Sequence, residues 1–302
     1  MASIAESPRL EHPLMPYVAI AGHDLRTLWR SKLVLLWLSV TALLTFFVTA
    51  GNWNQLTDAV LIASLLFPYL VFPWFLVVIM LGVTPVSGTQ AGTLADGILS
   101  RPVTRHGYLL ATWTARVATV LGVYLVILVP AILVITLADR PVPEDRVTIY
   151  GIVMTLSVVG LVLTLVVSLG FLAGTVLRKP LLAALVLIFA WYPVNLVLSV
   201  FSLEELSPIS LNQAATTLLR SDWQGDEDPS VAGTNQKEAE ALARQLTHFL
   251  GAFSGAPQQP QSKFFDSDKF LDLSLRRVVV GYSLPTLAAL GLSVFCFYRR
   301  DL

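Results

Sequence analysis

The chain has 302 residues, of which 55% are hydrophobic and only 13% are charged, and its mean hydropathy is +0.70. Soluble domains carry about 25% charged residues, so this composition excludes an ordinary soluble domain and predicts an integral membrane protein. The formal net charge is zero, which gives no support to a nucleic-acid partner. The single cysteine, Cys296, excludes an intrachain disulfide and a cysteine-rich metal site.

Residues 1–32 precede the first apolar run and contain Glu6, Glu11 and Asp24, so we expect no secretory signal here. In the stretch "PYVAIAGHDLRTLWRSK", apolar residues recur at helical spacing and the charged residues lie mostly on other faces. This pattern predicts a cytoplasmic N-terminus with an interfacial helix lying along the membrane surface. A plain helical extension of the first span fits the same pattern equally well.

Six apolar runs approach or exceed the ~20 residues that a helix needs to cross the hydrocarbon core. They cover roughly residues 33–50, 59–82, 108–137, 147–171, 180–201 and 278–298. The runs are continuously apolar rather than alternating, which argues against a barrel. The predicted fold is therefore an all-α membrane protein with six transmembrane helices. The third run is longer than the core is thick and contains Arg116, so we expect its first turns to project beyond the core.

Lysine and arginine gather in alternate connections, which sets the orientation of a membrane protein. The predicted inner segments carry Arg26, Arg30, Lys32, Arg101, Arg105, Arg178, Lys179, Arg299 and Arg300. The outer loop 51–58 carries no basic residue, and Arg140 and Arg146 in the loop 138–146 are outnumbered by acids. We therefore expect a multi-pass protein of the cytoplasmic (inner) membrane with both termini in the cytoplasm. Arg276 and Arg277, on the outer side of the last span, depart from this rule.

Four regions follow from this plan. Residues 1–32 form the N-terminus, and 33–201 hold the first five spans together with a cytoplasmic segment, 83–107. Residues 202–277 form a partly helical extracytoplasmic insertion between the fifth and sixth helices, and 278–302 hold the sixth helix and a short tail. "PISLNQAATTLLR" and "KEAEALARQLTHFLGAF" read as the helices of the insertion. The insertion either caps the outer mouth, binds an extracytoplasmic partner or packs loosely with no ligand, and the last interpretation is preferred.

Several kinds of catalytic site are absent from the sequence. There is no G-x-x-x-x-G-K-[ST], no H-E-x-x-H and no G-x-S-x-G, so we expect neither ATP binding by a P-loop nor an enzyme of the usual hydrolase classes. No carboxylate lies near the centre of a predicted span, and Asp58 stands at the rim of one. Ion-coupled carriers need ionisable groups inside the membrane, so such a carrier is disfavoured. No metal site is predicted.

Gly170 and Gly174 form a G-x-x-x-G pattern in "SLGFLAG", which permits two helices to approach closely. Packing within the chain is the first interpretation, and a contact between subunits is the alternative. Pro68, Pro73, Pro130, Pro193 and Pro285 are expected to bend their helices.

The cytoplasmic segment contains a short helix with signals at both ends. Thr93 and Asp96 have the spacing of a capping box, and Arg101 before Pro102 marks the end of the helix. Leu94, Ile98 and Leu99 form its apolar face. Such a helix has about two turns, or ~10 Å, and is too short to be stable alone. We interpret it as a knob that docks into another protein, while the alternative is a plain loop in which Arg101 and Arg105 only follow the charge rule.

"GTLADGILSRPVTRHGYLL" resembles the cytoplasmic signature of ABC-2 type transporter permeases. The matching residues are Gly92, Thr93, Leu94, Ile98, Leu99, Ser100, Arg101, Pro102, Val103, Thr104, Arg105, Tyr108 and Leu109. The stretch "DLRTLWRSK" before the first span and the six-span plan are also similar to this family. Many members carry an acidic residue shortly before the G-T pair, whereas this chain has Ser87, Gly88 and Gln90 there.

The resemblance implies the permease subunit of an ABC transporter, an exporter, that couples ATP hydrolysis by a separate ATPase subunit to substrate movement. It implies a homodimer, with ATP and Mg bound by the partner ATPase and no cofactor bound by this chain. Leu94, Ile98 and Leu99 would enter the ATPase groove, and Arg101 and Arg105 would pair with acidic ATPase residues or the phosphates of membrane lipids. The alternative is a non-transport scaffold or signalling subunit that acts on an extracytoplasmic partner through 202–277.

Overall fold

The computed structural model describes residues 15–83, 105–142, 147–177, 179–200, 207–220 and 275–299. Every regular element in these ranges is an α-helix. The predicted docking helix at 93–101 and the predicted helix "KEAEALARQLTHFLGAF" lie outside the described residues. The chain is an all-helical, multi-pass membrane protein, because five of its helical stretches are long and apolar enough to cross a membrane.

The five stretches are Lys32–Gly51, Asp58–Val83, His106–Leu137, Ile149–Val176 and Leu275–Phe297. They correspond to α2 (Lys32–Gly51), α3 (Asp58–Leu70) with α4 (Trp74–Val83), α6 (Arg105–Leu137), α7 (Ile149–Val176) and α11 (Leu275–Tyr298). The fifth predicted run forms α8 (Pro180–Val200), which provides only a shorter apolar stretch, Pro180–Asn195. A sixth membrane crossing therefore stays a prediction.

Helices α3 and α4 divide one predicted run into two helices at Pro73. Proline lacks the N–H that a continuing helix needs, and it disfavours the helical conformation of the residue before it. The helix accordingly stops at Leu70 and restarts at Trp74, and the Phe72–Pro73 peptide bond is cis. Pro68, Pro130, Pro193 and Pro285 instead lie inside helices α3, α6, α8 and α11.

Helix α7 forms the centre of the bundle and packs against α4, α11 and α9. Its contact with α4 depends on glycine, because a Cβ added to Gly170 would lie 3.0 Å from the Cα of Gly82. A Cβ added to Gly174 would lie 2.5 Å from the carbonyl oxygen of Val83. The G-x-x-x-G pair therefore faces a helix of the same chain, and the backbones of α4 and α7 touch where α4 ends.

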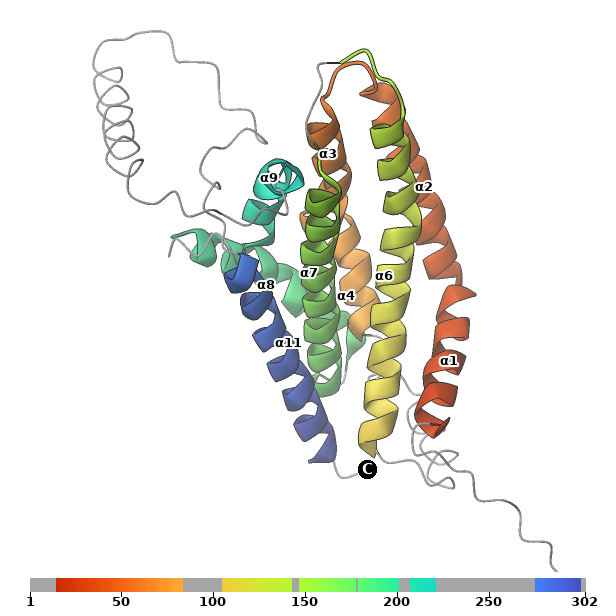
Figure 1. Ribbon diagram of the computed structural model, residues 1–302. Helices are drawn as coiled ribbons and strands as arrows, with labels where there is room; N and C mark the ends of the chain where they lie inside the picture. The colour runs from red at the N-terminus through yellow and green to blue at the C-terminus, as the bar shows by residue number, and fades with distance from the viewer. Residues whose placement is uncertain are drawn as a thin grey trace, which may run out of the picture.

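Figure 1 shows the helices running between two ends of the bundle. We call the end where α6 begins and α11 finishes the inner end, and the end where α2 is followed by α3 the outer end, after the predicted orientation. Helix α1 (Met15–Trp29) begins at the inner end too. The first described helix therefore begins, and the last described helix ends, at the same end of the bundle. This agrees with the prediction that both termini lie on one side of the membrane.

Helix α1 lies beside the first half of α6 and leads directly into α2 (Figure 1). The ring of Trp29 packs against α6, since its Cζ2 atom would be 2.8 Å from a Cβ added to Gly122. Residues 105–121, about 25 Å of helix, therefore extend past the start of α2. Ser31 takes an extended conformation between α1 and α2, so the two are separate helices. Both interpretations of the N-terminus, and the projection of Arg116 beyond the hydrocarbon core, stay predictions.

Helix α9 (Pro208–Leu219) is an integral part of the bundle at its outer end. It packs against α3 and α7, and even its polar residues Asn212 and Thr216 are buried. The backbone of Leu219 touches Gly151 at the start of α7, where any side chain on Gly151 would collide with it. The expectation of a loosely packed insertion is wrong for this helix, because the groove between α3 and α7 encloses it.

Candidate functional site at the inner end

The predicted docking segment is attached to two helices that meet at the inner end. Helix α4 leads into the segment after Val83, and α6 leads out of it from Arg105. Of the predicted site residues, Arg105, Gly170 and Gly174 are described, and the two glycines hold α7 against the end of α4. The others lie outside the described residues, namely Gly92, Thr93, Leu94, Asp96, Ile98, Leu99, Arg101 and Pro102.

Arg116 of α6 joins α6 to the last turn of α4. Its side chain is buried, with 8% of the residue exposed, and Nη1 donates a hydrogen bond to the carbonyl oxygen of Leu81. The last carbonyls of a helix have no partner within the helix, and a cation near them is favourable because of the helix dipole. Arg116 therefore stabilises the end of α4 from a neighbouring helix.

Thr112 joins the same part of α6 to α1. Its Oγ1 donates a hydrogen bond of 2.9 Å to Oδ2 of Asp24. Thr112 lies four residues before Arg116, so the two side chains share one face of α6. The carboxylate of Asp24 and the guanidinium of Arg116 interact electrostatically across this face without forming an ion pair within 4.0 Å. We call Asp24, Thr112, Arg116 and the Leu81 carbonyl the inner cluster.

Two further contacts come from the same turn of α6. The hydroxyl of Thr114 in α6 forms a hydrogen bond with the hydroxyl of Tyr17 in α1. The indole Nε1 of Trp113 donates to Oγ of Ser168 in α7 at 3.0 Å. Residues 112–116 thus bond to α1, α4 and α7, so a displacement of any of these helices is passed to the start of α6.

The inner cluster is incompletely bonded. The Nε of Arg116 is buried and has no hydrogen-bond partner within the described part of the chain. A buried donor without a partner costs free energy, on the order of 1–3 kcal/mol. This geometry can hold α4 and α6 together, and it leaves one donor of Arg116 able to take another acceptor when the helices shift.

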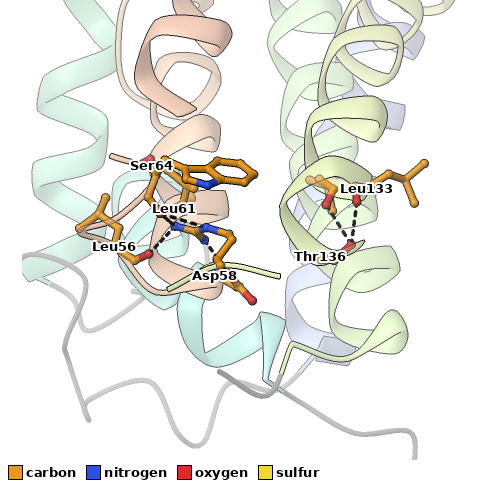
Figure 2. A network of polar contacts seen from close by, with 9 residues as sticks. Leu56, Asp58, Leu61, Ser64, Leu133 and Thr136 are labelled. Atoms are coloured by element: carbon orange, nitrogen blue, oxygen red, sulfur yellow. Dashed lines mark hydrogen bonds and ion pairs between the residues drawn. The ribbon is translucent and has the colours of Figure 1, made fainter. Parts of the chain in front are cut away.

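At the outer end, the buried side chain of a second arginine makes a network of four hydrogen bonds that we call the outer clamp. Arg140, just beyond α6, pairs through Nη1 with Oδ1 of Asp58 at 2.5 Å (Figure 2). Its Nη2 donates to the carbonyls of Trp53 at 2.5 Å and Leu56 at 2.7 Å, and its Nε donates to that of Trp53 at 3.1 Å. The guanidinium also lies 5.0 Å from the centre of the Trp53 ring. The clamp fastens the α2–α3 connection to the end of α6.

From the sequence, Arg116 was expected in a projecting turn and Arg140 only as an outnumbered cation of an outer loop. The signal for the inner cluster was present, since a single arginine interrupts a long apolar run. The signal for the outer clamp was weaker, and it lay in Asp58 at the rim of the second span. Among the described residues no group of three or more His, Cys, Asp or Glu gathers as a metal site would require.

Neither a scan against protein-family models nor a search among curated proteins gives a match for this chain. The likeness to ABC-2 permeases accordingly rests on residues 92–110, on the stretch "DLRTLWRSK" and on the predicted plan of the spans.

Proposed function

We propose that this chain is the permease subunit of an ABC exporter and pairs as a homodimer above two copies of a separate ATPase subunit. The proposal rests on the resemblance of residues 92–110 to these permeases, and it is supported by the inner cluster, which joins α4 and α6, the two helices that flank this segment in the sequence. An ATPase that moves this segment pulls on the end of α4 and the start of α6 at the same time. The Thr112–Asp24 and Trp113–Ser168 hydrogen bonds then pass the movement to α1 and α7.

The contact between α4 and α7 supports this role. Gly82, Gly170 and Gly174 bring the two backbones together with no side chain between them. Interfaces of small residues permit close approach, so a shift of α4 is transmitted to the central helix rather than absorbed by flexible side chains. Because α7 also packs against α11 and α9, the movement reaches both flanks of the bundle. In the proposed cycle this rearrangement opens a route for substrate.

The first experiment is purification of the chain from its native membrane with its partners. The proposal predicts that an ATPase subunit is recovered and that the chain stimulates ATP hydrolysis by that subunit. The proposal would be contradicted if no ATPase subunit were recovered and the chain stimulated ATP hydrolysis by no candidate ATPase. Recovery of an extracytoplasmic protein alone would favour the scaffold alternative.

A finer experiment tests the docking segment. Leu94→Asp with Ile98→Asp places two charges on the predicted apolar face and should abolish ATPase association while membrane insertion persists. Ser100→Asp is the control, because residue 100 is neither three nor four residues from Leu94, Ile98 or Leu99 and therefore lies off their face. Equal loss of association in the control and the double variant would contradict a specific groove contact.

A further inference from the structure

Three cations gather where α1 turns into α2. Arg26 and Arg30 are one helical turn apart and therefore lie on one face, and Lys32 is the first residue of α2. All three are exposed, and within the described ranges no carboxylate lies within 4.0 Å of any of them. We call Arg26, Arg30 and Lys32 the basic corner.

The nearest acidic side chain does not neutralise the basic corner. Asp24 is the one carboxylate in α1 and α2, and its Oδ2 accepts the hydrogen bond of Thr112. Its carboxylate is thus turned toward α6, whereas the three cations face outward. Within the described part of the chain, no carboxylate balances the charge of these three cations.

The surface next to the basic corner is apolar and uncovered. Helix α2 exposes Leu36, Leu43 and Phe47 by 67%, 55% and 61%, and Leu33, Leu35, Val40 and Phe46 are exposed beside them. From Leu33 to Leu43 the face is about 15 Å long at 1.5 Å per residue. One leaflet of a bilayer has a hydrocarbon thickness of about 15 Å, so an acyl chain matches this face in both length and chemistry.

The basic corner lies at the depth of lipid headgroups. Helix α2 has 20 residues, the length of one crossing, and its first residue is Lys32. Trp29, which packs against Gly122, sits at the same boundary, where indole rings are favoured. Arg26 lies three residues before Trp29 in α1, about 4.5 Å along the helix, which is within the headgroup layer of about 5–7 Å that the bilayer dimensions imply.

We infer that the basic corner is a binding site for an anionic phospholipid, with the headgroup on Arg26, Arg30 and Lys32 and the acyl chains along the exposed face of α2. Juxtamembrane clusters of basic residues attract anionic headgroups, and guanidinium groups bind phosphate oxygens through paired hydrogen bonds. A zwitterionic headgroup brings its own cation to the three cations of the corner, so the site discriminates between lipid classes. The inference is independent of the proposed transport function.

The test compares two lipids with identical acyl chains on the full-length chain. The purified protein is incubated with phosphatidylglycerol or with phosphatidylcholine, and retained lipids are counted by native mass spectrometry. The wild type should retain phosphatidylglycerol in preference to phosphatidylcholine. Replacement of the corner by Arg26→Gln, Arg30→Gln and Lys32→Gln should reduce that preference by roughly tenfold or more.

A matched control removes the same amount of charge elsewhere. Arg220→Gln, Arg276→Gln and Arg277→Gln change three exposed arginines away from the corner, two of them on α11 across the bundle (Figure 1). This variant should keep the preference of the wild type. Equal loss in both triple variants, or no loss in the corner variant, would overturn the inference.

Two further arms cover the remaining outcomes. Inorganic phosphate at the same concentration should not displace phosphatidylglycerol, because it cannot use the apolar face of α2, and displacement would overturn the lipid assignment. If the triple corner variant does not fold, the single variant Arg30→Gln is measured in its place. It should show a smaller loss in the same direction, and retention equal to that of the wild type would contradict the site.

Discussion

The two buried arginines near the ends of α6 are bonded very differently. Arg140 in the outer clamp pairs with a carboxylate, donates to two carbonyls and lies over an aromatic ring. Arg116 in the inner cluster donates to one carbonyl and keeps an unbonded Nε within the described surroundings. Arg140 is therefore held by several strong bonds, whereas Arg116 keeps an unbonded donor, which fits the proposal that movement enters at the inner end.

Removal of the outer clamp should have the largest effect on stability. Arg140→Ala leaves the Asp58 carboxylate and two carbonyls without their donor, and loss of one partner of a buried ion pair costs about 3–5 kcal/mol. The free energy of unfolding, measured by chemical denaturation in detergent, should fall by that amount. Gln55→Ala removes an exposed side chain at the same end and should change the free energy of unfolding by less than about 0.5 kcal/mol. Equal effects of the two variants would contradict a fastened outer end.

An added side chain at the α4–α7 contact should have the next largest effect. Gly174→Ala places a Cβ 2.5 Å from the Val83 carbonyl oxygen, so the backbones must separate. Overpacking of this kind costs about 1–3 kcal/mol, so the midpoint temperature of thermal unfolding should fall. Gly291→Ala is the control, because nothing lies within 4 Å of its added Cβ. A Gly174→Ala chain as stable as the control would show that α4 does not depend on close approach.

Arg116→Met should change stability least, within about 1–2 kcal/mol in either direction. Replacement of a buried charge by an apolar side chain of similar length is often neutral, and here it also removes the unbonded Nε. If the inner cluster passes movement to α6, the variant should keep its ATPase partner bound but lose stimulation of ATP hydrolysis. Arg116→Lys retains one donor and should recover part of the stimulation. Full stimulation in Arg116→Met would remove the cluster from the coupling route.

The helical architecture could be read from the sequence where the signal is local. Apolar runs of membrane length predicted the positions of α2, α6, α7 and α11. The helix boundary at Pro73 also follows from a local cause, the missing N–H. Each of these features can be predicted because it depends only on residues that are close together in the sequence.

Features that depend on distant contacts could not be predicted in the same way. Arg140 reads as a solvated loop cation because its partners, Trp53, Leu56 and Asp58, are more than 80 residues away. The mixed polar sequence of α9 reads as a surface helix, and only the groove between α3 and α7 explains why Asn212 is buried. Likewise, the spacing of Gly170 and Gly174 predicted a close approach but did not name α4 as the neighbour.

The most direct test of the central claim is a pair of distances measured in the complex with the proposed ATPase. Spin labels at Gly22 and Lys179 report on the inner end, and labels at Gln55 and Arg220 report on the outer end, after Cys296→Ser. All four labelled positions are exposed. On addition of a non-hydrolysable ATP analogue, the inner distance should change while the outer distance stays the same. A change at the outer end with a constant inner distance would contradict the account.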